Sequence, residues 1–279
     1  MRSNSSNTII SFCILITFTT TIQAQLADPV FVKQVCSPNQ TTTTNTATYE
    51  NNLRTLLSLL SSNATATKFH TTTVLGTTSS DTLYGLFMCR LDVPSHFCFR
   101  CVSNATTNIS SDPECSLSKQ GVTWYAECMV RFSNVAFFST VDTSPSWALS
   151  NHVNASSNST LFMGLLFDAM NRTAEEAANS GNCSTCLGEA IGYLPSCCEG
   201  KEGGRVGYPS CTVWYELYPF YGLATNQTPT KTSPSSGDVV TRLHFYLFDD
   251  MASLGRCGVP ISMFHGRTLS SAIMSLLLG

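Results

Sequence analysis

Cysteine is the residue of this chain whose number and spacing could support chemistry, with thirteen cysteines in 279 residues. Two pairs have C-x2-C spacing, Cys98 with Cys101 and Cys183 with Cys186. Such pairs can ligate zinc, exchange electrons or form disulfides. The five His residues show no ligand spacing, and no βαβ pattern surrounds either pair. We therefore expect disulfides, with no metal and no cofactor.

The beginning of the chain indicates the compartment. Arg2 precedes a short apolar run, residues 9–18, and residues 19–25 end in small side chains. This pattern is typical of a signal peptide over residues 1–24, cleaved after Ala24, and the run is too short to span a bilayer. Cys13 would leave with the peptide. We predict a secreted, extracellular (apoplastic) protein whose remaining cysteines form disulfides.

The composition predicts a polar surface with little charge. Charged residues make up 12% of the chain and the net charge is −3. No basic stripe indicates a nucleic acid or an anionic membrane as partner. N-x-[ST] sequons would carry glycans on solvent-facing Asn residues, and we expect about half of them to be used. The candidate sites are Asn39, Asn63, Asn104, Asn108, Asn154, Asn158, Asn171 and Asn226.

An internal repeat organises the chain. The segment from Cys98 to Cys128 parallels the segment from Cys183 to Cys211, with separations of 30 and 28 residues. Two copies of one module are the simplest account of this self-similarity. We predict module one over residues 28–137, module two over residues 138–222, and a linker with an atypical tail over residues 223–279.

The hydrophobic pattern predicts the elements of module one. Apolar residues from Tyr49 to Leu60 recur at helical spacing, and a second short helix begins at Cys98. Residues 82–91 indicate a strand, and residues 121–133 alternate as one further strand. Helices and strands in this order favour an α+β module, with helices on one face of an antiparallel sheet.

Module two is predicted to be internally truncated. Residues 161–178 have the pattern of its first helix, yet Cys183 follows almost at once. The missing piece corresponds to residues 68–93 of module one, which hold a predicted strand and Cys89. We therefore expect module two to lack a strand, and expect Cys183 to lack its disulfide partner.

The spacing Cys89-x8-Cys98-x2-Cys101, together with three further cysteines of module one, resembles the ginkbilobin-homologous (stress-antifungal) domain of land plants. In module two the resemblance is carried by residues 183–187 (CSTCL), 194–198 (LPSCC) and 203–221. It covers residues 28–222. Tandem copies occur in cysteine-rich receptor-like kinases, repeat secretory proteins and plasmodesmata-located proteins. The implied fold is two helices packed on a five-stranded antiparallel sheet.

The resemblance also implies a disulfide order, where six cysteines alone would allow fifteen pairings. The implied bonds are Cys36–Cys115, Cys89–Cys98, Cys101–Cys128 and Cys186–Cys211. It implies no partner for Cys197, Cys198 or Cys257.

Some members of this family bind mannose through three residues placed relative to the first and last cysteines. The residues are an Asn after the first, an Arg six residues before the last and a Glu five residues after it. Module one has Ser37, Val122 and Ser133 at these positions, and none matches. In module two Arg205 and Glu216 match, but no cysteine begins that module, so no Asn is assigned. A structural Arg–Glu contact on adjacent strands is the alternative interpretation.

No recognisable catalytic motif is found, and we expect a protein that is not an enzyme. The leading hypothesis is a secreted binding or defence protein whose partner is an extracellular protein or a carbohydrate. One alternative is a truncated relative of a cysteine-rich receptor-like kinase, because residues 238–279 hold no kinase signature and no apolar run of about 20 residues. Another is a mannose-type carbohydrate-binding antifungal module.

Overall fold

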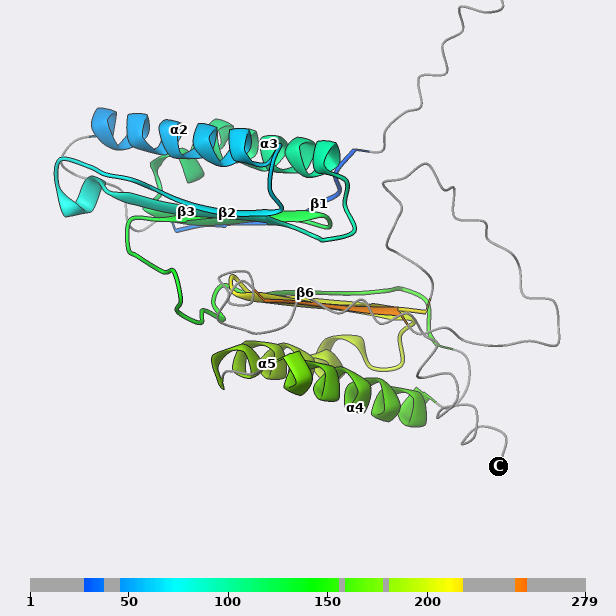
Figure 1. The fold of residues 1–279 in the computed structure, drawn as a ribbon. Helices are drawn as coiled ribbons and strands as arrows, with labels where there is room; N and C mark the ends of the chain where they lie inside the picture. The colour runs from blue at the N-terminus through cyan, green and yellow to red at the C-terminus, as the bar shows by residue number, and fades with distance from the viewer. Residues whose placement is uncertain (1–27, 38–45, 156–158, 178–180, 218–243, 250–279) are drawn as a thin grey trace, which may run out of the picture.

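The computed structural model describes residues 28–37, 46–155, 159–177, 181–217 and 244–249. The expected signal peptide and Cys257 lie outside these residues. Two α+β modules are stacked so that their sheets face each other and their helices lie on the outside (Figure 1). The layers are therefore helix, sheet, sheet and helix, which confirms the predicted fold class.

Module one contains two long helices, two 3-10 turns and five strands. They are β1 (Phe31–Cys36), α2 (Thr46–Asn63), β2 (Phe69–Val74), η2 (Ser79–Asp81), β3 (Leu83–Cys89), α3 (Ser95–Ser111), η3 (Cys115–Leu117), β4 (Gln120–Tyr125) and β5 (Cys128–Ser133). All neighbouring strands are antiparallel, in the order β1-β4-β5-β3-β2.

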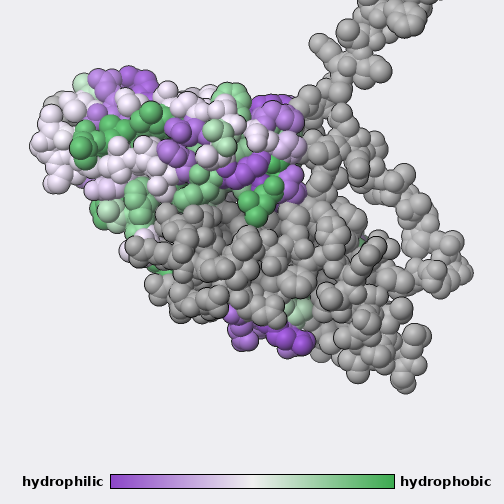
Figure 2. Space-filling model, in the orientation of Figure 1, coloured by the Kyte–Doolittle hydropathy of each residue, from purple (hydrophilic) through white to green (hydrophobic). Residues whose placement is uncertain are grey.

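The predicted apolar face of α2 packs against this sheet. Tyr49, Leu56 and Leu60 have no exposed surface, and Leu53 is nearly as buried. A Cβ at Gly85 of β3 would lie 2.9 Å from Leu56 Cδ2, so the missing side chain lets the helix lie close to the strand. On the side of the module visible in Figure 2, hydrophilic and hydrophobic residues are interspersed.

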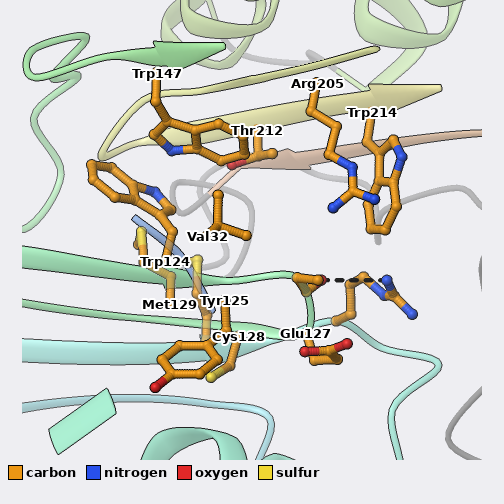
Figure 3. A pocket seen from close by; sticks show the side chains of 13 residues that line it. Val32, Trp124, Tyr125, Glu127, Cys128, Met129, Trp147, Arg205, Thr212 and Trp214 are labelled. Carbon is orange, nitrogen blue, oxygen red and sulfur yellow. Dashed lines mark hydrogen bonds between the residues drawn. The ribbon is translucent and has the colours of Figure 1, made fainter. Parts of the chain in front are cut away.

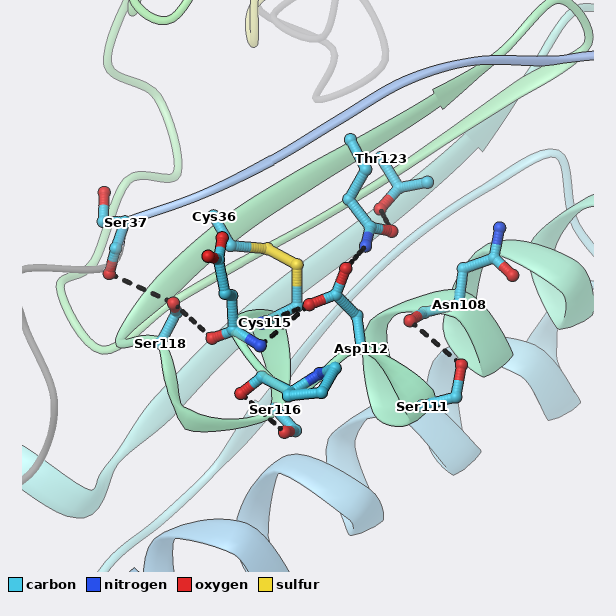
Figure 4. The surroundings of a disulfide bond; sticks show 12 residues. Cys36, Ser37, Asn108, Ser111, Asp112, Cys115, Ser116, Ser118 and Thr123 are labelled. Atoms are coloured by element: carbon cyan, nitrogen blue, oxygen red, sulfur yellow. Dashed lines mark hydrogen bonds between the residues drawn. A yellow bond between two sulfur atoms is a disulfide. The ribbon is translucent and has the colours of Figure 1, made fainter.

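Three disulfides join the elements of module one. Cys36–Cys115 ties β1 to η3, Cys89–Cys98 ties β3 to α3, and Cys101–Cys128 ties α3 to β5. Around the first bond, Asp112 Oδ1 accepts hydrogen bonds from the Glu114 and Cys115 N–H groups at 2.8 and 3.1 Å. Ser118 Oγ also donates to the Ser37 carbonyl (Figure 4). Each bond is one that the resemblance implies.

The predicted strand over residues 121–133 is two strands, which corrects the sequence analysis. β4 and β5 pair as a hairpin in which Trp124 lies opposite Met129, and Ala126 and Glu127 lie between the strands. Neither Gly, Asn nor Pro occupies this turn, so the usual sequence signal for a hairpin is missing.

Module two repeats the plan with a shorter sheet. Its elements are β6 (Trp147–Ser150), α4 (Ser159–Ala177), α5 (Gly181–Cys198), β7 (Gly203–Gly207), β8 (Cys211–Glu216) and β9 (His244–Asp249). The strand order is β6-β7-β8-β9. Cys186–Cys211 ties α5 to β8 as implied. Cys183 lies on α5, but the structure does not describe its side chain. The expectation that Cys183 lacks a disulfide partner therefore stays a prediction.

Strand β9 occupies in module two the place that β3 occupies in module one. β3 pairs with β5 with Cys89 opposite Cys128, and β9 pairs with β8 in the same direction with Asp249 opposite Cys211. The expected end of module two at Gly222 is therefore too early, because the tail supplies a strand of its sheet. Among the described residues, no strand corresponds to β2.

Ser150 of β6 occupies the position of Cys36. Each lies opposite the glycine seven residues before the last cysteine of its module, Gly121 or Gly204. A Cβ on either glycine would meet a cysteine sulfur at 2.7 Å, that of Cys36 in module one and that of Cys198 in module two. Cys198 thus faces a serine and is bonded instead to its neighbour Cys197.

Breaking the backbone pairing of β9 should loosen module two. Adjacent residues of an antiparallel strand turn their N–H groups to opposite sides. Replacing both Tyr246 and Leu247 by Pro therefore removes one bond to β8, and we expect a loss of at least about 1 kcal/mol. Hydrogen exchange at the amides of β8 should accelerate, while that of β5 should not. The control variant replaces Ser235 and Ser236 by Pro, and equal exchange in both variants would contradict the assignment of β9.

Restoring the missing cysteine should restore the missing bond. In Ser150→Cys we expect a disulfide between the introduced cysteine and Cys198 and a free thiol at Cys197, read by disulfide-resolved peptide mass spectrometry. In the chain-entropy model, closing a loop of about 50 residues adds about 4 kcal/mol. The matched control is Asn151→Cys, whose side chain lies on the opposite face of the sheet. A bond from residue 151 to Cys198 would refute the register.

Candidate ligand site between the sheets

The inner faces of the two sheets meet in a cluster of large apolar side chains. The buried members are Leu86, Met88, Val122, Trp124, Met129, Phe137, Trp147 and Trp214. The indoles of Trp124 and Trp147 lie 6.2 Å apart with their planes at 67°, the edge-to-face geometry that aromatic pairs prefer. Trp124 belongs to β4, whereas Trp214 belongs to β8, the counterpart of β5. The two residues are both buried, but they do not occupy equivalent strands of the two modules.

Arg205 and Glu216 are brought together on this inner face of module two. Arg205 of β7 lies opposite Trp214 of β8, and its guanidinium carbon is 3.2 Å from the centre of that indole ring. Arg205 Nη2 is 3.8 Å from Glu216 Oε1, and Trp214 Nε1 donates to the same oxygen at 2.9 Å. The structural contact between the two charged residues is therefore present.

The register also places an asparagine beside this pair. The Asn151 N–H donates to the Gly203 carbonyl at 2.8 Å, just as the Ser37 N–H of module one donates to the Gln120 carbonyl. Asn151 thus holds the position of Ser37, next to the residue that replaces the first cysteine. The three positions that the resemblance connects with mannose are filled in module two by Asn151, Arg205 and Glu216. Sequence reasoning missed Asn151 because it located this position by a cysteine.

The Glu216 carboxylate is held in a tight environment. Its side chain is only 5% exposed. Oε1 accepts from Trp214 and faces Arg205, whereas Oε2 is buried without a hydrogen-bond partner in the described structure. Gly203 lies opposite Glu216, and a Cβ there would overlap Oε2. Glycine at position 203 thus leaves the room that the carboxylate occupies, and Oε2 remains an unused acceptor.

A pocket of about 460 Å³, open to solvent at its mouth, lies between the modules (Figure 3). Its apolar lining includes all three tryptophans of the chain, with Val32, Met88 and Met129. In Figure 3, Trp124 and Trp147 lie together at one end, and Arg205 with Trp214 lies at the other. The charged groups that line the pocket are Arg90, Arg205 and Glu127.

Burial affects the pKa of the carboxyl group that lines this pocket, and ion pairs hold its guanidinium groups. Burial raises the pKa of the Glu127 carboxyl, against smaller opposing effects of a hydrogen bond from the Val30 N–H and of Arg90 and Arg205. Arg90 Nε and Nη2 donate to the two carboxylate oxygens of Asp92, each at 2.8 Å. The Arg90 guanidinium also lies 5.3 Å from the Trp214 ring centre, so this indole contacts cations from both modules.

The expected glycosylation sites differ in their exposure to solvent. Asn104, Asn154 and Asn171 are exposed. Asn63 and Asn108 are partly buried, and their amides donate to the Leu59 carbonyl and the Tyr125 hydroxyl at 2.8 and 2.7 Å. The remaining three candidates, Asn39, Asn158 and Asn226, lie outside the described residues. Use of any of these sites stays a prediction.

Other kinds of site find no support in the described part of the chain. No group of three His, Cys, Asp or Glu residues there could hold a metal ion. Within the same residues, no helix has the length and apolar character needed to cross a membrane.

Comparisons with known proteins agree with this architecture. The family model described as salt stress response/antifungal matches residues 35–135. Cysteine-rich repeat secretory protein 38 of Arabidopsis thaliana is 31% identical over 245 residues, covering 77% of this chain and 96% of the relative. An antimicrobial ginkbilobin-2-like protein of Castanea crenata is 33% identical, covering 70% and 89%. The chain therefore belongs to the salt stress response/antifungal family, whose modules are also named DUF26 or ginkbilobin-like.

Larger relatives and solved structures extend the comparison. Cysteine-rich receptor-like protein kinase 25 of Arabidopsis thaliana is 34% identical over 242 residues, and the match spans 75% of this chain but 35% of the kinase. The crystal structure of the tandem DUF26 ectodomain of the Arabidopsis thaliana receptor-like protein PDLP5 shares the fold, with a TM-score of 0.55 and 24% identity. It covers 67% of this chain and 99% of that ectodomain.

The lengths of these matches show that the alignment contains gaps, and the truncation of module two stays a prediction. The match to the secretory protein extends over 245 positions, yet 77% of 279 residues is only about 215 residues. About 30 positions of the alignment therefore have no residue from this chain. That number is close to the size of the piece, residues 68–93 of module one, that module two is predicted to lack.

Filling the space beside Glu216 should damage this site. In Gly203→Ala, the added methyl group must displace the buried carboxylate from Trp214 Nε1, and we expect a loss of about 1–3 kcal/mol in the free energy of unfolding. The control is Gly188→Ala on the exposed side of α5, where a Cβ meets nothing within 4 Å. That variant should gain about 0.5–1 kcal/mol. Chemical denaturation measures both values, and an unchanged Gly203→Ala midpoint would disprove the crowding.

Proposed function

We propose that this chain is an extracellular, non-catalytic binding protein of plant defence, and that module two binds a mannose-type carbohydrate. The observation that carries the carbohydrate site is the juxtaposition of Asn151, Arg205 and Glu216 on the inner face of sheet β6-β7-β8. The names of the relatives, a secretory protein and an antimicrobial ginkbilobin-2-like protein, support the extracellular defence role.

The chemistry of the three side chains suits a sugar. An amide, a guanidinium and a carboxylate together donate and accept hydrogen bonds, and charged partners strengthen the bonds that they make. Glu216 Oε2 is the unused acceptor, and a sugar hydroxyl could donate to it. Arg205 remains partly exposed, at 22% of its side chain. Asn151 is also partly exposed, and its Oδ1 already accepts from the Val153 N–H at 3.0 Å.

A second candidate role follows from the kinase relatives, which carry cysteine-rich modules alongside a much longer chain. In this proposal the two modules act as the sensing part of a receptor-like protein and bind an extracellular protein ligand. A screen against extracellular proteins, with glycans removed from the bait, would distinguish this role from sugar binding.

Asn151→Asp gives the sharpest test of the carbohydrate site. The carboxylate keeps an acceptor for the Val153 N–H but removes the amide donors that would reach a sugar hydroxyl. We expect binding to immobilised α-mannosides on a glycan array to weaken at least about tenfold, the effect of a lost hydrogen bond worth about 1.4 kcal/mol. Arg205→Ala should weaken binding similarly.

The matched control is Ser37→Ala, at the same position of module one, where the other two site residues are absent. Its mannoside binding should equal that of the wild-type protein. The carbohydrate proposal is wrong if the wild-type protein shows no mannoside binding, or if Asn151→Asp binds as the wild type does.

A further inference from the structure

The pocket between the modules contains two buried hydrogen-bond donors that no group in the described structure accepts from. Trp124 is 2% exposed and Trp147 8% exposed, and the indole N–H of each lacks a partner there. A buried donor left unpaired destabilises the folded protein. Both residues line the same pocket and their rings are in contact. A molecule in the pocket with acceptor oxygens would remove this cost at two points.

The walls of the pocket favour a flat apolar body. Three indoles contribute broad aromatic faces, and Met88 and Met129 add thioethers, which make favourable contacts with aromatic rings. In Figure 3, Val32 lies between the Trp124–Trp147 pair and Arg205. The space of about 460 Å³ includes open solvent at the mouth of the pocket.

The charged lining favours an anion. Two guanidinium groups line the pocket, those of Arg90 and Arg205, against one carboxyl, that of Glu127. Their ion-pair partners, Asp92 and Glu216, are not part of the lining. Burial makes the ionised form of Glu127 less favourable than usual, so the guanidinium groups of Arg90 and Arg205 are the charged groups of the lining that an anion would contact.

We propose that this pocket binds a small hydroxylated aromatic carboxylate. The aromatic ring of the ligand lies among the tryptophans, and its carboxylate faces Arg205. The oxygen of the hydroxyl group on the ring accepts hydrogen bonds from the indole N–H groups of Trp124 and Trp147. Since the walls come from both modules, such a ligand would hold the two sheets together. The site shares Arg205 with the mannoside proposal but does not depend on Asn151.

The test uses 4-hydroxybenzoate as the probe and the whole secreted chain. Every tryptophan of the protein lines this pocket, so intrinsic tryptophan fluorescence reports on it alone, and isothermal calorimetry gives the dissociation constant. The double variant Trp124→Phe with Trp147→Phe keeps two aromatic rings but removes both N–H donors. We expect its dissociation constant to rise about 10- to 30-fold, as for two lost hydrogen bonds.

Charge is tested separately with a neutral analogue. Arg205→Gln should weaken binding of 4-hydroxybenzoate about tenfold, yet leave binding of 4-hydroxybenzamide unchanged. The control Tyr193→Phe, on the exposed surface of α5, should alter neither. Arg205→Gln also keeps the test decisive if the double tryptophan variant fails to fold, which circular dichroism would show.

Three results would overturn the proposal. They are the absence of saturable 4-hydroxybenzoate binding up to about 10 mM, unchanged affinity in the folded double variant, and an equal loss of affinity for both probes in Arg205→Gln. Loss of mannoside binding in Asn151→Asp together with unchanged 4-hydroxybenzoate binding would support two distinct sites that share Arg205.

Discussion

The packing of one sheet against the other is the constraint on which the rest of this structure depends. It leaves strands such as β5 buried on both faces, one against helices and one against the opposing sheet. Polar groups at the junction then need partners from their surroundings. Arg131 of β5 pairs with Asp142 at 2.6 Å, and the Asp142 N–H donates to Ser210 Oγ of module two at 3.0 Å. The candidate sites lie at this junction because there charged and aromatic groups meet away from water.

The sequence predicts most accurately the elements that have one buried face. Helix α2 packs on its own sheet and against α3 and leaves its other side exposed, so its apolar residues keep a helical period and the prediction from Tyr49 to Leu60 is confirmed. The same holds for α4. The pattern predicted a helix over residues 161–178, and the observed helix begins two residues earlier and ends one residue earlier. The disulfides of module one came from the resemblance, because spacing alone leaves many pairings open.

The features that sequence reasoning missed share one physical cause, because no local residue pattern marks them. The β4–β5 turn carries Ala126 and Glu127, so nothing in its composition marks a break. Strand β9 pairs with β8 across a long stretch of chain, and such pairing leaves no local pattern. Asn151 was hidden because Ser150 replaces a cysteine, although the register of β6 on β7 preserves the position. Local pattern therefore predicts elements better than it predicts which of them meet.

The distant origin of β9 also affects the order in which the protein is made. All the strands of module one have been synthesised once the ribosome passes Ser133, so that sheet can close early. The sheet of module two must wait for residues 244–249, and until then the backbone edge of β8 lacks this neighbour. Open edges invite pairing with other chains, and domains that complete late are prone to misassembly. In the cell, module two should therefore depend on chaperones more than module one does.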